Sequence, residues 1–269
     1  MKKIALMLLL TGVSASVLAE DVRVAVAANF TAPVKELAPV YEKVTGDKLV
    51  LSFGATGAFY AQIKNGAPFD VLLAADAKTP AKVVKEGLGV DGSTFTYAIG
   101  KLVVWSADAS FIKDEKSLEN PALNKLAVAD PRLAPYGEAA METLTALKLR
   151  DKLEPKFVVG GNIGKTFQFL KSENAQAGFV ALSQCYKNGA FTSGSGWVVP
   201  QSLYNTIRQD AVLLKAGEKN EEYETQVTPT GKPFRRILHD LLQIVLQQLP
   251  LILLDESKHL QNMFCTRFL

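Results

Sequence analysis

Short apolar runs alternate along the chain with segments whose apolar residues recur at helical spacing. The apolar runs predict strands over residues 22–27, 49–53, 69–74, 102–105, 126–129, 157–159, 178–182, 197–199 and 211–214. The helical spacing predicts helices over residues 33–44, 58–64, 138–147 and 165–170, and a further helix that begins at Thr79-Pro80. Strands that alternate with helices of about ten residues are typical of βαβ units. The pattern therefore predicts an α/β protein with mostly parallel sheets and flanking helices.

This alternation occupies most of a chain of 269 residues, a length at which one core commonly gives way to two domains. No stretch rich in Pro, Gly or Ser separates two halves. We therefore expect two domains in contact, joined by strands that cross between them, rather than two units on a flexible linker.

The first residues have the pattern of an export signal. Lys2-Lys3 precede the apolar run 4–13, and Val17-Leu18-Ala19 fits a cleavage site of small residues. The apolar run is shorter than the roughly 20 residues of a membrane span, so we expect residues 1–19 to be a cleaved signal peptide. Removal of the two lysines lowers the formal net charge from +3 to +1, which gives no indication of nucleic-acid binding.

Residues with metal-binding or nucleophilic chemistry are few. The two cysteines, Cys185 and Cys265, have no metal-ligand spacing, and the only histidines are His239 and His259. Export would allow the cysteines to pair, but we expect two separate thiols. No Ser-His-Asp arrangement is evident. The sequence therefore predicts no metal centre, no cofactor and no enzyme.

Two strand ends pass directly into helices through small and polar residues. The first is VAVAANFT at residues 24–31, and the second is SFGATGAFY at residues 52–60. Asn29 and Thr56 could each be an N-cap, a position that these residue types favour. Small neighbours also let a ligand approach the backbone N–H groups at the positive end of the helix dipole. Two such turns on neighbouring strands predict a site for an anion.

The segment GGNIGKT at residues 160–166 occupies a third turn of this kind. It has part of a P-loop pattern, which would indicate a nucleotide hydrolase, but Val159 stands where that pattern needs a glycine. The loop is one residue too short to wrap two phosphates in the same way. We favour a turn whose backbone N–H groups face the same anion.

Tyr136 ends the turn DPRLAPY at residues 130–136, which follows an apolar run. A phenolic O–H is a neutral donor that an oxyanion site can use, although a surface aromatic on a proline-stiffened loop has the same pattern. Arg132 and Lys165 are possible charge partners of an anion, although long basic side chains are more often solvated.

In their order along the chain, these blocks resemble the periplasmic molybdate-binding proteins, the receptor subunits of molybdate ABC importers. The similarity extends from the leader to about Lys219. It includes AANF at 27–30, SFGATG at 52–57, QIxxGAPFD at 62–70 with Ala75-Asp76, Asp130-Pro131, and Pro135-x-Gly137. The resemblance implies the two-lobed architecture of periplasmic binding proteins, with a ligand cleft between the lobes. It also implies a periplasmic monomer that binds molybdate and tungstate as oxyanions, without a bare metal cation, and delivers them to a membrane permease.

By motif position, the resemblance places ligand contacts at Asn29, Thr56, Tyr136 and the backbone of Ile163. Some members have a tyrosine where this chain has Ala181, and Tyr136 is expected to supply the missing hydroxyl. A receptor for sulfate or a small organic acid remains an alternative. An organic acid would favour an arginine fork on its carboxylate, and no arginine stands out at the strand ends.

The resemblance also divides the chain. We expect lobe 1 at residues 20–100, lobe 2 at 101–202, a return to lobe 1 at 203–220 and a divergent tail at 221–269. The lobes are expected to open and close about crossings near Gly100-Lys101 and residues 200–204. Family members end with a helix and a short strand on the first lobe, whereas the Leu- and Gln-rich run 237–254 has the pattern of neither. We therefore expect the first lobe to lack part of its apolar cover.

Overall fold

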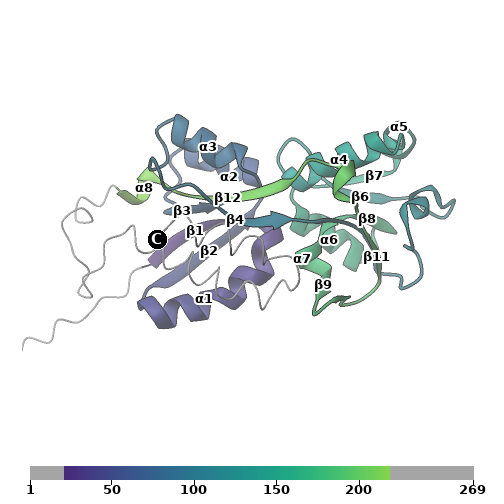
Figure 1. Cartoon of the computed structure of the whole chain (residues 1–269), viewed down its shortest axis with the longest axis horizontal. Coiled ribbons are helices and arrows are strands. Elements are labelled where there is room, and N and C mark those ends of the chain that lie inside the picture. The colour runs from purple at the N-terminus through teal and green to yellow at the C-terminus, as the bar shows by residue number, and fades with distance from the viewer. Residues whose placement is uncertain (1–20, 219–269) are drawn as a thin grey trace, which may run out of the picture.

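The computed structural model describes residues 21–218, which form two lobes side by side (Figure 1). Each lobe is built on a five-stranded sheet with helices against both faces. The expected signal peptide (residues 1–19), the expected tail (221–269) and Cys265 lie outside the described residues. Within residues 21–218, no helix is long and apolar enough to cross a membrane.

The first lobe contains the N-terminal strands. Its sheet has the order β2 (Lys48–Gly54), β1 (Asp21–Ala27), β3 (Val71–Leu73), β12 (Ile207–Leu213) and β4 (Phe95–Gly100). Its helical segments are η1 (Ala28–Phe30), α1 (Thr31–Thr45), α2 (Thr56–Lys64), α3 (Lys78–Lys85) and α8 (Lys215–Glu218). Val24 and Val26 of β1 pack with α1, whereas Ala25 faces α2 and α3. Because both faces are covered, the strand is apolar throughout rather than alternating.

The second lobe repeats this layering. Its sheet has the order β11 (Ser195–Val198), β5 (Leu102–Ser106), β8 (Ala177–Ala181), β6 (Leu126–Ala129) and β7 (Phe157–Gly160). Its helical segments are η2 (Glu115–Glu119), α4 (Pro135–Ala146), α5 (Arg150–Leu153), η3 (Glu154–Lys156), α6 (Ile163–Lys171), α7 (Leu182–Cys185) and η4 (Gln201–Leu203), and a small hairpin joins β9 (Tyr186–Lys187) to β10 (Ala190–Phe191). In β5, Val104 packs with α4 and Val103 with α6.

Within residues 21–218, the chain passes between the sheets twice. It leaves the first sheet at Gly100 and enters the second at Leu102, and it returns between Val198 and Ile207. The Leu102 N–H donates to Tyr204 Oη at 3.1 Å, so the two crossings lie against each other. They are the backbone connections between the lobes.

The α/β fold with two lobes and mostly parallel sheets is confirmed, because only one strand of each sheet, β12 or β5, runs opposite to the others. β1 is parallel to β2 and β3, and β6 is parallel to β7 and β8. β12 is antiparallel to β3 and β4, and β5 is antiparallel to β8 and β11. The antiparallel strands adjoin the crossings, because a strand that returns from the other lobe enters its sheet from the opposite end.

Three local features differ from the sequence expectations. β4 was not predicted, because Thr96 interrupts its apolar pattern. The helix predicted to begin at Thr79-Pro80 begins one residue earlier, at Lys78 (α3), and the Thr79 N–H donates to Asp76 Oδ1 at 2.6 Å. Val44 is 56% exposed at the end of α1, although it shares the spacing of the buried residues of that helix.

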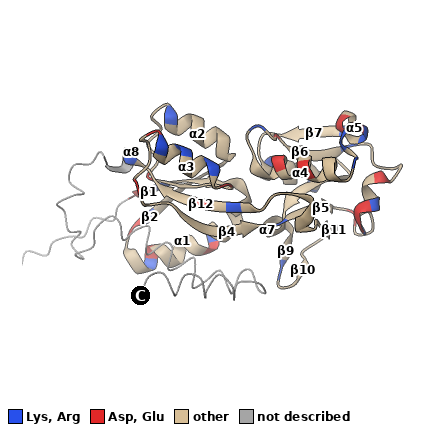
Figure 2. Cartoon of the chain, turned by 45° about the horizontal axis from the view of Figure 1, so that its top comes forward, with Lys and Arg blue, Asp and Glu red and all other residues tan. Residues whose placement is uncertain are grey.

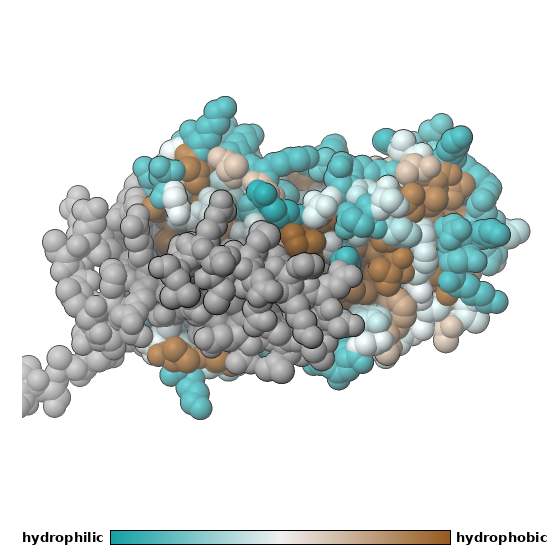
Figure 3. All heavy atoms as spheres, viewed as in Figure 1, coloured by the Kyte–Doolittle hydropathy of each residue, from teal (hydrophilic) through white to brown (hydrophobic). Residues whose placement is uncertain are grey.

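Hydrophilic residues spread over much of the visible surface, with hydrophobic residues between them (Figure 3). Single exposed apolar side chains are normal for a soluble domain. In the part of the chain that the structure describes, the exposed large hydrophobic residues are Val44, Val50, Phe53, Leu133, Val159 and Val198.

Candidate ligand site between the lobes

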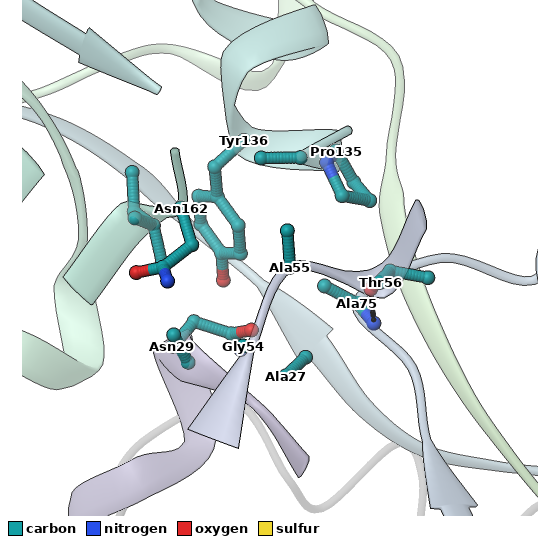
Figure 4. A pocket seen from close by; sticks show the side chains of 12 residues that line it. Ala27, Asn29, Gly54, Ala55, Thr56, Ala75, Pro135, Tyr136 and Asn162 are labelled. Atoms are coloured by element: carbon teal, nitrogen blue, oxygen red, sulfur yellow. Dashed lines mark hydrogen bonds between the residues drawn. The ribbon is translucent and has the colours of Figure 1, made fainter. Parts of the chain in front are cut away.

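A small cavity of about 10 Å³ lies between the lobes, where several strands end (Figure 4). It has room for about one water molecule and is far smaller than the roughly 300 Å³ or more of pockets for organic ligands, which argues against an organic ligand in this arrangement of the lobes. Its lining from the first lobe is Ala27, Ala28, Asn29, Gly54, Ala55, Thr56 and Ala75, and from the second lobe Ala134, Pro135, Tyr136, Asn162 and Ile163.

All four sequence-predicted contact residues line this one cavity. Asn29 belongs to η1 directly after β1, and Thr56 is the first residue of α2. Tyr136 lies in the first turn of α4, and Ile163 is the first residue of α6. The fold therefore brings four separate strand-to-helix turns, two from each lobe, to a common point (Figure 4).

Neither Asn29 nor Thr56 acts as an N-cap, so that interpretation is wrong. Ala55 is the N-cap of α2 and Ala134 that of α4, and neither alanine supplies a side-chain hydrogen bond to its helix. First-turn N–H groups have no partner inside a helix. Pro135 has no N–H, and the Gly57 and Gly137 N–H groups donate to the Leu133 and Ala134 carbonyls, so only the remaining first-turn N–H groups of these two uncapped helices can serve a ligand.

The hydroxyl groups of Thr56 and Tyr136 share one arrangement. Thr56 Oγ1 accepts a hydrogen bond from the Ala75 N–H at 2.9 Å. Tyr136 Oη accepts one from Gln209 Nε2 at 3.3 Å. Within residues 21–218, neither hydroxyl has a hydrogen bond as donor to another residue. Both oxygens are therefore occupied as acceptors while both protons are available to a ligand.

Asn29 is the third polar side chain of the cavity, and it is 3% exposed. Its Nδ2 donates to Gln209 Oε1 at 2.7 Å. Its Oδ1 is buried without a hydrogen-bond partner among the described residues. An amide oxygen can only accept, so the group that Asn29 can offer to an oxyanion is the second hydrogen of its Nδ2.

The site is electrically neutral apart from the partial charges of its donors. Burial raises the pKa of Tyr136 above its usual value, and hydrogen bonds from Gln209 and Asn29 only partly oppose this effect. The phenol therefore stays protonated at neutral pH and remains a donor. Figure 2 shows the charged residues of the described chain mainly on the outer helices and loops.

Arg132 and Lys165 do not line the cavity, which favours the alternative that these long basic side chains are solvated. The Arg132 guanidinium pairs with Asp130, with Nη2 2.7 Å from Oδ2, and its side chain is 85% exposed. This pairing lowers the pKa of Asp130. Lys165 is also exposed. Burying a long basic side chain carries a desolvation penalty that its attraction to the ligand would not offset, so both side chains remain hydrated.

The structure also excludes the P-loop interpretation. Only Gly161 and Asn162 separate β7 from α6, which is too short a loop to wrap phosphates. The Asn162 Oδ1 accepts the Lys165 N–H at 2.9 Å and so caps α6. Among the described residues, no group of three or more His, Cys, Asp or Glu side chains could hold a metal ion.

Ala181 and Cys185 both lie close to α7 and outside the cavity lining. Ala181 is fully buried, and its N–H donates to Gln184 Oε1 at 2.9 Å. Cys185 is a buried free thiol, and burial raises its pKa to about 12. It is therefore an unreactive core residue at neutral pH.

Besides the bond from Gln209 Nε2 to Tyr136 Oη, four further contacts between described residues join the lobes around the cavity. Two are buried or partly buried: the Gly57 N–H donates to the Leu133 carbonyl at 2.9 Å, and Ser183 Oγ donates to the Asn29 carbonyl at 2.7 Å. Two are ion pairs on the rim, Lys78–Glu138 and Lys187–Glu36, each 3.0 Å long. A second cavity of about 350 Å³ lies beside the Lys78–Glu138 pair. The lobes are therefore closed on each other.

Sequence reasoning missed Gln209, which contacts two of the four predicted residues from β12. The one sequence signal that could have indicated Gln209 is its polar side chain within an otherwise largely apolar strand. It also missed Ala75 as a backbone donor to Thr56, although Ala75-Asp76 was part of the motif set.

Comparison with known proteins decides the family. A sequence profile of the family described as bacterial extracellular solute-binding protein matches residues 22–225. The chain belongs to this family. As a solute-binding protein it is not an enzyme, which confirms the expectation from the sequence.

Two relatives of this solute-binding protein carry the name molybdate-binding protein ModA. The one from Azotobacter vinelandii is 54% identical over 203 residues, which cover 75% of this chain and 81% of the relative. The one from Rhodobacter capsulatus is 47% identical over 213 residues, which cover 79% and 83%. The solved structure of a periplasmic molybdate-binding protein of Azotobacter vinelandii has a TM-score of 0.74 at 33% identity, and it covers 87% of this chain and 100% of that one.

Proposed function

We propose that this solute-binding protein captures one molybdate ion between its lobes and delivers it to the membrane permease of an ABC importer. The observation that carries the proposal is the convergence of uncharged hydrogen-bond donors from both lobes on one small cavity. The names of its relatives support the same ligand. The proposed contacts are the Asn29 amide, the Thr56 and Tyr136 hydroxyls and the backbone at Ile163.

Hydrogen bonds from neutral donors are sufficient to hold a dianion. Bonds to a charged group contribute about 1.5–3 kcal/mol each, so six or seven give on the order of 10–20 kcal/mol before costs. Dehydration of the ion and closure of the lobes offset part of this. A net binding free energy of about −8 to −12 kcal/mol corresponds to micromolar to nanomolar affinity.

Selection among oxyanions of equal charge should depend on the size of the cavity rather than on charge. Tungstate is expected to bind like molybdate because both are large tetrahedral dianions. Sulfate is expected to bind more weakly because it is smaller and cannot reach donors on both lobes at once. The lining residues include no arginine, which argues against an organic acid as ligand.

Isothermal titration calorimetry against sodium molybdate, tungstate, sulfate and phosphate tests the proposal. We expect one molybdate per chain, a similar affinity for tungstate, and at least tenfold weaker binding of the other two ions, on the scale where tenfold is about 1.4 kcal/mol. Sulfate binding more tightly than molybdate in the same buffer would contradict it.

The proposed setting is the periplasm, reached through a cleaved signal peptide at residues 1–19, and the proposed state is a monomer. Support comes from the basic and apolar pattern of the leader and from the periplasmic relative. Light scattering after size-exclusion chromatography tests the monomer. A dimer with or without molybdate would contradict that part of the proposal.

A further inference from the structure

Gln209 is a buried polar residue that links the two lobes beside the candidate site. It lies on β12, and it is 3% exposed. The pairing of β12 with β4 shifts register between Gln209 and Asp210. Such irregularities redirect side chains away from the normal alternation of a strand. Here the Gln209 amide reaches residues that line the cavity.

The amide of Gln209 is held from three sides. Its Oε1 accepts from Asn29 Nδ2 at 2.7 Å and lies 3.1 Å from Tyr97 Oη, whose one proton is shared with the Ala74 carbonyl at 2.8 Å. Its Nε2 donates to Tyr136 Oη at 3.3 Å. Asn29 and Tyr97 belong to the first lobe, whereas Tyr136 belongs to the second. The two ends of the amide therefore have different partners in different lobes.

The donor end of this amide determines what Tyr136 can do. An amide N–H can only donate, so the Tyr136 oxygen accepts and its own proton must point elsewhere. Because Tyr136 lines the cavity, its hydroxyl can donate that proton to an anion bound there. An acceptor at the same position would instead take the proton and remove Tyr136 from the ligand.

We propose that Gln209 is a positioning residue of the anion site, whose amide directs the Tyr136 hydroxyl proton toward the ligand while its oxygen holds one hydrogen of Asn29 Nδ2. This inference rests on the proposed function and adds a residue that does not touch the ion. Because the bond from Gln209 to Tyr136 joins the lobes, it forms only when the lobes are together, and it couples lobe closure to the orientation of the donors.

The substitution Gln209→Glu tests this proposal through pH. A carboxylate at this position has acceptors at both ends, so it takes the Tyr136 proton and also repels the dianion. A protonated carboxyl again has one donor and one acceptor. Buried carboxyls can have pKa values raised by about 3–5 units. We therefore expect sodium molybdate to bind the variant on the order of a hundredfold more weakly at about pH 9, with recovery toward wild-type affinity at about pH 6.

Two further variants separate positioning from general damage. Gln209→Leu removes both ends of the amide, so it should weaken binding roughly tenfold without recovery on acidification. Gln168→Glu makes the same charge change at an exposed position of α6 and should behave as wild type.

Tyr97 and Tyr136 are the titratable groups in contact with Gln209, and burial raises the pKa of both. Asp76 and Asp210 act on Tyr97, so wild-type protein is titrated over the same range.

The outcomes distinguish the two proposals. If wild-type protein does not bind molybdate, the proposed function fails. If wild type binds and both Gln209 variants bind equally well at every pH, the function stands and the positioning role fails. Thermal unfolding without molybdate shows whether each variant is folded, and a folded Gln209→Glu protein that does not recover on acidification also overturns the positioning role. If that variant does not fold at about pH 9, Gln209→Asn is titrated instead, and wild-type affinity in it overturns the proposal.

Discussion

Thr56 and Tyr136 contribute to the site through hydroxyl groups whose oxygens are already occupied. The Ala75 N–H donates to Thr56, and Gln209 donates to Tyr136. A hydroxyl in this state behaves as a pure donor, which an oxyanion favours over a group that also presents lone pairs. The protein thereby obtains donors without burying a positive charge, whose desolvation would be costly.

We expect Tyr136→Phe and Thr56→Ala each to weaken molybdate binding by about 1–3 kcal/mol, the cost of leaving a buried oxyanion one donor short. Thr56→Ala also leaves the Ala75 N–H without its acceptor, so Thr56→Ser, which keeps the hydroxyl, is the matched control. Lys165→Ala should change affinity much less, because Lys165 is exposed and does not line the cavity. Calorimetry measures all four. Loss of binding in Lys165→Ala with none in Tyr136→Phe would require a different site.

Molybdate affinity should be almost constant between about pH 6 and about pH 9. Tyr136 is the only ionisable side chain that lines the cavity, and burial raises its pKa above the ordinary value of 10.0. A phenol with a raised pKa in the folded state contributes stability that is complete below its unfolded pKa and declines as pH rises above it. Binding and folding should therefore weaken only above about pH 10. Calorimetry over a pH series checks this, and a tenfold change inside the flat range would reveal another titrating group.

At the scale of elements, α2 and α4 begin without side-chain caps, and their starts face each other across the cavity. Helix starts of this kind are natural anion sites because their N–H groups point outward at the positive end of the dipole. Gly57 in the first turn of α2 donates to the Leu133 carbonyl of the other lobe. The Gly57 N–H thus joins the two lobes, while the other N–H groups in the first turn of α2 remain available to a ligand.

Gly57→Ala should selectively disfavour the closed state. A Cβ at Gly57 would lie 3.2 Å from both Cα and O of Leu133, which is tight contact with backbone. Overpacking costs about 1–3 kcal/mol, and here it falls only on the closed arrangement. Molybdate affinity should drop roughly tenfold or more, while thermal unfolding without molybdate stays unchanged.

Gly161→Ala is the matched control, because a Cβ there meets no atom within 4 Å. It lies between β7 and α6, directly before the cavity-lining Asn162. We expect wild-type affinity in this variant. Equal effects of the two substitutions would show that the contact between Gly57 and Leu133 is not what closes the lobes.

At the scale of the whole molecule, two backbone crossings and a ring of contacts hold the lobes together. The rim ion pairs are largely exposed, with Lys78 at 81% and Glu138 at 51%, and exposed pairs contribute little. Closure therefore depends on the buried contacts and on the ligand that both lobes share. A ligand that binds the closed state better shifts the population toward it.

Small-angle X-ray scattering should show a smaller radius of gyration with molybdate than without it. The expected motion is a hinge at the crossings between Gly100 and Leu102 and between Val198 and Ile207. An ion bound between two lobes must enter through an opening, so the ligand-free protein should be more open on average. An unchanged radius would mean that the site stays closed or that the ion does not bind.

The sequence by itself determined the α/β class, the strand-to-helix turns and the residue types at them. These features depend on local preferences: apolar runs for buried strands, and small or polar residues where a strand passes into a helix. The order of the motif blocks also pointed to Asn29, Thr56, Tyr136 and Ile163, and all four line one cavity.

Only the tertiary structure decided how these residues cooperate. The antiparallel strands beside the crossings, the bulge that redirects Gln209, and the bond between Gly57 and Leu133 join residues far apart in the chain. The local sequence pattern does not identify such partners. The spacing of apolar residues indicates which face of a helix or strand is buried, but not which residues pack against that face. Arg132 illustrates the same limit: its sequence position suggested an anion partner, and the folded chain pairs it with Asp130 instead.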